Sequence, residues 1–79
     1  MNNNEKLTAA FSEALNIDTA LVKDTLAYQS IPEWDSISHM ILISLLEQKF
    51  EVSIDTQDVL DMSSVGKAKE LLGKHGISF

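Results

Sequence analysis

A long and nearly uncharged stretch, from residue 36 to residue 50, constrains the fold of this chain most. Its apolar residues recur at the spacing of a helix and extend over more than one face. They are Ile37, Met40, Ile41, Leu42, Ile43, Leu45, Leu46 and Phe50. Asp35 and Ser36, two residue types that favour helix starts, stand at its beginning. The stretch therefore predicts one helix over 36–50 that packs against other helices.

The apolar residues of this helix fall into two groups. The stripe with core-facing spacing is Leu42, Ile43, Leu46 and Phe50, and His39 lies on the same side. Ile37, Met40 and Ile41 widen the apolar arc beyond what one core face needs. A crossing of helices would bury all of them, whereas a single packed face would leave an apolar ridge beside Ser36. We expect Ile37, Met40 and Ile41 to form such a ridge on the surface.

Three further helices are expected around this one. They span about residues 5–15, residues 55–62, and a segment from a cap at Ser63–Ser64 to about residue 74. Asn4 is the expected cap of the first, after a loosely ordered start at residues 1–4. Since no strand pattern is convincing, the sequence predicts an all-α fold. It is a four-helix bundle of three longer helices and one short helix, in a single domain over residues 1–79.

The connection over residues 16–35 is long for a compact domain and has little helical pattern. Such loops are usually functional or carry short structure of their own. A short helical turn is expected near residues 19–23, and Pro32 disfavours helix at Ile31. The side chains expected to hold the connection to the core are Ile17, Leu21, Val22, Leu26 and Ile31.

The charge balance excludes one class of partner. The chain has twelve acidic residues, six lysines and no arginine, which gives a net charge of -6. Nucleic-acid binding needs clustered cations, so it is not expected. An acidic surface steers a protein toward basic patches on partner proteins, although the same charge also serves solubility alone.

Further absences limit the chemistry and the location. The chain has no cysteine, which excludes a disulfide framework, a thiolate metal site and a cysteine nucleophile. The first residues lack a signal-peptide pattern, and no apolar run is long enough to span a bilayer. We therefore expect a cytoplasmic protein, and a monomer, because nothing signals oligomerisation. So short a chain has little room for an enzyme pocket of about 300 Å³ or more.

Ser36 is the residue that points most directly to a function. It stands where an apolar helix begins, after a long connection, so its hydroxyl is expected in solvent beside unpaired backbone N–H groups. The positive end of a helix dipole stabilises an attached phosphate. We therefore interpret Ser36 as the carrier of a phosphodiester-linked arm. Taken alone, an Asp-Ser pair before an apolar run is more often just a helix cap.

The wider sequence resembles the acyl carrier protein family over nearly its full length. The resemblance lies in Trp34-Asp35-Ser36-Ile37 at the opening of the long helix and in Leu46-Glu47-Gln48-Lys49-Phe50 at its end. It extends to Val52-Ser53-Ile54 before a short acidic helix and to Ser63-Ser64-Val65 before the last helix. Length, acidity and the spacing of these segments strengthen the match.

The resemblance implies a carrier and not an enzyme. In this family a phosphopantetheinyl transferase uses coenzyme A to attach 4′-phosphopantetheine to the serine, here Ser36. Acyl groups then travel on the terminal thiol as thioesters. The implied partners are that transferase, an acyl-activating ligase, and an acyltransferase or synthase. Asp35 is expected to cap the helix beside the attachment site.

The sequence departs from the family pattern at the expected docking surface. Enzymes bind these carriers largely through the second helix, and carriers of fatty acid synthesis usually place acids two and five positions after the serine. Here Ser38 and Ile41 occupy those positions. Docking through apolar contact is therefore expected, by Ile37, Met40 and Ile41. Trp34 is a further docking candidate, although it suits a loop anchor better. A carrier dedicated to one pathway fits better than a housekeeping role.

Other polar residues are given structural interpretations. His39 lies three positions after Ser36, but no third group would orient it for catalysis, so we expect a packing histidine. His75 is expected to favour the end of the last helix. Asp55, Asp58 and Asp61 lack the ligand spacing of a calcium loop. No catalytic residue and no metal site is predicted.

Three cargoes or roles remain open at this point. The first is an acyl thioester. The second is an aminoacyl or peptidyl cargo, as on the D-alanyl carriers of cell-wall modification, for which a short polar group would need no apolar cavity. The third is an unmodified helical adaptor that binds apolar ligands through the long helix, an interpretation that intact Ser36 disfavours.

Overall fold

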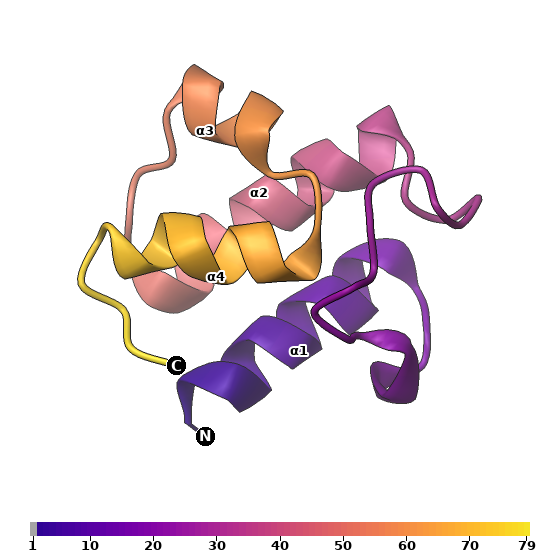
Figure 1. Ribbon diagram of the computed structural model, residues 1–79, viewed down its shortest axis with the longest axis horizontal. Coiled ribbons are helices and arrows are strands. Elements are labelled where there is room, and N and C mark those ends of the chain that lie inside the picture. The colour runs from indigo at the N-terminus through magenta and orange to yellow at the C-terminus, as the bar shows by residue number, and fades with distance from the viewer. Residues whose placement is uncertain (1) are drawn as a thin grey trace.

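Residues 2–79 fold into four α-helices and one turn of 3-10 helix. A computed structural model describes residues 2–79 (Figure 1). The elements are α1 (Asn3–Leu15), the 3-10 turn η1 (Thr19–Leu21), α2 (Ser36–Phe50), α3 (Thr56–Asp61) and α4 (Val65–Gly73). Within residues 2–79 there is no strand, only an isolated antiparallel bridge between Ala27 and Ser64. The predicted all-α bundle is confirmed, and α2 has the bounds that the apolar stretch predicts.

The first helix begins earlier than the sequence suggested. Asn2, not Asn4, is the cap: its side chain accepts a hydrogen bond from the Glu5 N–H at 2.8 Å. The Glu5 carboxylate in turn accepts from the Asn2 N–H, which completes a capping box. Asn2 therefore caps the helix and residues 3 and 4 belong to its first turn, while Met1 lies outside the described residues. At the other end, Asn16 adopts the left-handed conformation expected of a C-cap, with φ 55°.

The core lies where α1, α2 and α4 face one another. Its fully buried side chains include Leu7 and Phe11 of α1, Leu42 and Leu46 of α2, and Leu72 of α4. The buried residues of α2 are the predicted stripe together with His39. In Figure 1, α3 lies beside α2 and away from α1, and the two chain ends lie near each other. The short helix therefore covers one side of α2 and leaves the main core to the longer helices.

The long connection is tied to the start of α4 by its backbone. The Leu26 carbonyl accepts from the Val65 N–H at 2.9 Å, and the Asp24 carbonyl accepts from the Gly66 N–H at 3.0 Å. A Cβ at Gly66 would lie 3.3 Å from that Asp24 oxygen, so glycine permits the close approach. These bonds hold the connection in place before it reaches α2.

One predicted anchor of the connection is wrong. Ile17, Val22, Leu26 and Ile31 pack against the core as expected, but Leu21 is 53% exposed. Leu21 belongs to η1, and successive side chains of a 3-10 turn point about a third of a turn apart. Leu21 and Val22 therefore cannot both face the core. Val22 packs against it, and Leu21 points to solvent.

The starts of α3 and α4 match the sequence signals. Asp55 caps α3 by accepting from the Asp58 N–H at 2.8 Å, and Ser64 caps α4 by accepting from the Lys67 N–H at 3.1 Å. No helix in the described part of the chain is long and apolar enough to cross a bilayer.

Candidate functional site

Ser36 is the first residue of α2, and it is exposed to solvent. Asp35, in an extended conformation, is the cap, and its carboxylate accepts a hydrogen bond from the Ser38 N–H at 2.9 Å. The two residues thus have different roles at the helix start. Asp35 satisfies a backbone donor, which leaves the Ser36 hydroxyl free of a capping role at the positive end of the helix.

The capping bond also changes the acidity of Asp35. The hydrogen bond from the Ser38 backbone stabilises the charged carboxylate, and so it lowers the pKa of Asp35 below its ordinary value. Because the pKa is lowered in the folded protein, the contribution of this group to stability is complete above its ordinary pKa. That contribution is lost as the pH falls through the folded-state pKa.

Replacing Asp35 with asparagine should reduce the acid sensitivity of folding. Asparagine is also a good helix cap, but it does not titrate. Between about pH 5 and about pH 2, the unfolding temperature of Asp35→Asn should therefore fall less than that of the wild type. Glu33→Gln is the control, because it removes a nearby exposed charge without removing a cap. An identical acid response of Asp35→Asn and the wild type would contradict the assignment of the cap.

Trp34 lies inside the molecule and not on its surface. It has no exposed area, and its ring forms T-shaped pairs with Phe11 and Tyr28 at centroid distances of 5.3 and 6.1 Å. Trp34 is therefore corrected from a docking candidate to a loop anchor, the other interpretation that the sequence allowed. Burial of so large an aromatic ring stabilises the fold more than its exposure to solvent would.

His39 bridges the loop, α2 and α3. The Trp34 Nε1–H donates to His39 Nδ1 at 3.0 Å, and His39 Nε2 lies 2.9 Å from the Val59 carbonyl oxygen. An indole nitrogen can only donate, so Nδ1 accepts, and the Nε2–H donates to the Val59 carbonyl oxygen. Both ring nitrogens are thus engaged, which leaves His39 no nitrogen to activate Ser36. The expectation of a packing histidine agrees with this geometry.

The remaining polar candidates form no catalytic or metal site in the described chain. His75 Nε2 lies 3.9 Å from an Asp58 carboxylate oxygen, a contact that is an ion pair only when the histidine is protonated. Asp55 serves as a cap, and Asp61 accepts a hydrogen bond from Gln57. No group of three acidic or histidine side chains among residues 2–79 could hold a metal ion.

An apolar patch adjoins Ser36. Ile37, Met40 and Ile41 are 73%, 58% and 48% exposed, which confirms that these three side chains lie on the surface. Leu60 of α3, 72% exposed, belongs to the same region because it lines one cavity with Met40 and Ser36. We call these four residues the apolar patch. Sequence reasoning missed Leu60, since neighbouring Val59 and Leu60 carry no signal that tells which one faces outward.

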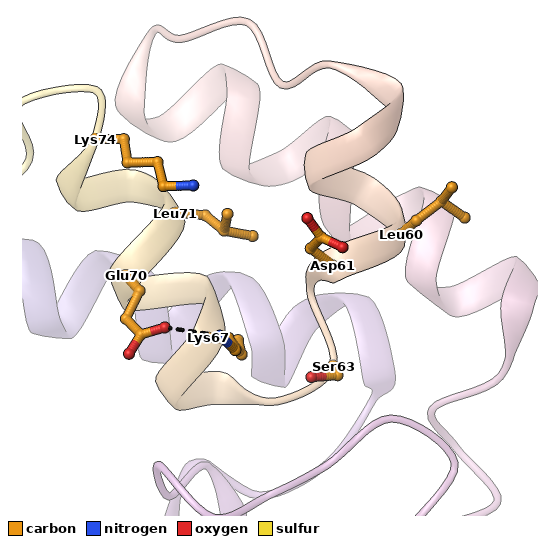
Figure 2. Close-up of a pocket in the computed structure, with 7 residues that line it drawn as sticks. All are labelled: Leu60, Asp61, Ser63, Lys67, Glu70, Leu71 and Lys74. Carbon is orange, nitrogen blue, oxygen red and sulfur yellow. Dashed lines mark ion pairs between the residues drawn. The ribbon is translucent and has the colours of Figure 1, made fainter.

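Two hollows lie beside α3, and only one of them involves Ser36. A cavity of about 270 Å³ has Ser36, His39 and Met40 of α2 on one side and Val59, Leu60 and Met62 on the other. A larger hollow of about 460 Å³ separates α3 from α4, where Lys67 and Glu70 form an ion pair (Figure 2). In Figure 2 the Leu60 side chain points away from α4. The apolar cavity is the one that adjoins the candidate attachment residue.

Comparison with known families decides the class of protein. The chain matches the family model described as a phosphopantetheine attachment site over residues 5–72, from α1 into α4. It belongs to the phosphopantetheine-binding, or acyl carrier protein, family. Comparisons with curated proteins and with solved structures give no match.

As a member of this family, the chain is a carrier protein and not an enzyme, and its cofactor is covalently attached 4′-phosphopantetheine. The helix start suits such a group. The first turn of α2 holds no acidic residue, and its outward-facing backbone N–H groups favour an anion. The chain has no thiol of its own, so the thiol of the attached arm is the one available to the carrier.

Proposed function

We propose that Ser36 bears the 4′-phosphopantetheine arm and that the chain shuttles an acyl group, as a thioester, between enzymes of a dedicated biosynthetic pathway. The observation that carries this proposal is the exposure of Ser36 at the first position of α2, beside an aspartate that performs the capping. A hydroxyl in that position is open to a modifying enzyme on its solvent side. The product, a phosphodiester, would lie at the positive end of the helix.

The residues of this chain have simple roles in that scheme. The Ser36 oxygen replaces the adenosine bisphosphate portion of coenzyme A on the phosphorus atom, and its proton passes to the transferase. Asp35 keeps the helix start in place during the exchange through its bond to the Ser38 N–H. The attached arm supplies a thiol, on which cargo is held as a thioester. Partner enzymes then recognise and bind the folded domain.

The cavity beside Ser36 supports an acyl cargo over an aminoacyl one. Met40, Val59, Leu60 and Met62 contribute apolar side chains to its wall. A small polar group gains little from such a wall, whereas burial of each methylene contributes about 0.8 kcal/mol. A cargo with an apolar portion, held at the end of a flexible arm, therefore has a favourable resting place next to the attachment residue.

The proposed partners are a phosphopantetheinyl transferase, an acyl-activating ligase, and an acyltransferase or synthase. We place their contact on the apolar patch, because it adjoins Ser36 and exposes four large apolar side chains. Uncharged Ser38 and Ile41 weaken electrostatic recognition on this face. Recognition by apolar contact favours enzymes shaped for this one carrier, and this is the basis for proposing a dedicated pathway.

Replacing Ile41 with glutamate should impair transfer of cargo while leaving the fold intact. Ile41 is about half exposed, and surface substitutions usually change stability by less than about 0.5 kcal/mol. A charge in the middle of an apolar contact would be desolvated on docking, so we expect slower loading by the cognate ligase. The measurement is the rate of ligase loading beside the unfolding temperature.

Gln48→Glu is the matched control, because it adds the same charge to exposed α2 surface two turns farther from Ser36. Its loading rate should remain near that of the wild type. A strong loss of thermal stability in Ile41→Glu would show that Ile41 belongs to the core. Unchanged loading would remove the apolar patch from the docking surface.

The attachment itself is tested by mass. The purified chain is incubated with coenzyme A, magnesium and a broad-specificity phosphopantetheinyl transferase, and its intact mass is measured. We expect the gain of one phosphopantetheine, which peptide mapping should locate at Ser36. No gain would overturn the carrier role and favour an unmodified adaptor. A gain at another residue would overturn the assignment of the site.

A further inference from the structure

We propose that His39 is a specificity-determining residue that limits the acyl cargo to short and medium chain lengths. The inference rests on the proposed function, because it concerns the cavity beside the proposed attachment residue. His39 forms one wall of that cavity, and its ring joins α2 to the Val59 carbonyl of α3. That bond joins two of the residues that line the cavity, one from each helix.

The cavity stops one turn into α2. Its lining from this helix is Ser36, His39 and Met40, all from the first turns. Farther along, Ile43 and Leu46 are 5% and 0% exposed and belong to the closed core. A chain that enters beside Ser36 therefore meets the imidazole of His39, and the residues that follow on this side of α2 are closed core.

The His39 bridge resists displacement, because both of its hydrogen bonds would be lost together. Moving the ring aside would separate Nδ1 from the Trp34 N–H and Nε2 from the Val59 carbonyl. Trp34 has no exposed area, so water could not replace the lost partner of its N–H. A buried donor without an acceptor is strongly unfavourable. An apolar chain offers no replacement bond, so the bridge should stay closed against it.

The volume of the cavity sets the approximate limit. At about 30 Å³ for each non-hydrogen atom, the share of a water molecule in the liquid, its 270 Å³ holds roughly nine such atoms. With about nine non-hydrogen atoms an octanoyl group fills that space, whereas about half of a hexadecanoyl group, with about seventeen, must remain outside. The structure thus assigns this carrier a cargo of octanoyl length or shorter.

The experiment is to load Ser36 with acyl-phosphopantetheine of increasing length and to measure stability. A promiscuous transferase accepts butanoyl, octanoyl and hexadecanoyl coenzyme A, and intact mass confirms each product. In the wild type, the unfolding temperature should rise by at least about 4 °C from the unacylated to the octanoyl form. It should rise no further with hexadecanoyl. A continued rise with hexadecanoyl would overturn the inference.

Variants test whether His39 sets the limit. His39→Ala should make the hexadecanoyl form more stable than the octanoyl form, since the wall is removed. Ile43→Ala is the matched control, because it also removes side-chain volume from α2 but keeps the His39 bridge. Its unfolding temperature should rise no further from the octanoyl to the hexadecanoyl form. An unchanged length limit in folded His39→Ala would overturn the role of His39.

A second measurement keeps the inference testable if His39→Ala does not fold. The NMR chemical shifts of backbone and methyl groups of the wild type are compared between the octanoyl and hexadecanoyl forms. Residues at the mouth, Met40 and Leu60, should shift, whereas Ile43 and Leu46 should not. Shifts at Ile43 and Leu46 would show that the chain passes His39. Failure to load any acyl group at Ser36 is detected by mass and overturns the proposed function, and this inference with it.

Discussion

Replacing Ser36 with alanine is expected to abolish incorporation of phosphopantetheine. The alanine side chain has no oxygen to form the phosphodiester, so the loss should be complete and independent of transferase concentration. The fold should be unaffected, because Ser36 is exposed and the cap of α2 is supplied by Asp35. We expect the free energy of unfolding to remain within about 0.5 kcal/mol of the wild type. Intact mass and thermal unfolding measure the two effects.

Ser38→Ala is the matched control for this substitution. It removes a hydroxyl from the same first turn but keeps the backbone N–H that binds Asp35. Its modification should match that of the wild type. Residual labelling of Ser36→Ala together with loss of labelling in Ser38→Ala would move the attachment site to Ser38. Equal loss in both would indicate damage to the transferase contact.

Trp34→Ala is expected to have the largest effect on stability. Large-to-small substitutions of buried aromatic residues cost about 3–5 kcal/mol, and Trp34 has no exposed area. The substitution also leaves His39 Nδ1 without its donor. Since small domains have only about 5–15 kcal/mol of stability, this change should bring the chain near unfolding at ordinary temperatures. Urea denaturation followed by circular dichroism measures the loss.

Trp34→Phe separates the two contributions of this residue. Phenylalanine restores most of the ring packing against Phe11 but cannot donate to His39. Its stability should therefore lie between those of Trp34→Ala and the wild type. A loss below about 1 kcal/mol in Trp34→Ala would contradict the anchor role. Impaired partner transfer without loss of stability would restore the docking interpretation of this tryptophan.

Local signals in the sequence were sufficient for the helices. The apolar stretch predicted α2 with its observed bounds, because a helix that must bury one side keeps the spacing of 3.6 residues throughout. Cap residues act within three positions along the chain, so Asp35 and Ser64 could be identified without tertiary information. The cap at Asn2 was missed although its signal is local, because Asn2, Asn3 and Asn4 offer the same side chain and only Asn2 stands three positions before Glu5.

Residues outside a repeating pattern could not be placed in the same way. Leu21 and Leu60 lie in helical segments too short to show a face, and the structure leaves both exposed. Trp34 lies in a loop with no periodicity, where burial depends on whether distant Phe11 is beside it.

The sequence by itself determined the helices, the position of Ser36 at the start of α2, and the exposed surface of Ile37, Met40 and Ile41. Each of these follows from spacing or capping within one segment of chain. Tertiary structure alone decided the bridge from Trp34 through His39 to Val59 and the cavity that ends there. These features join α2 to a loop and to α3, and contacts between separate segments depend on how the helices pack.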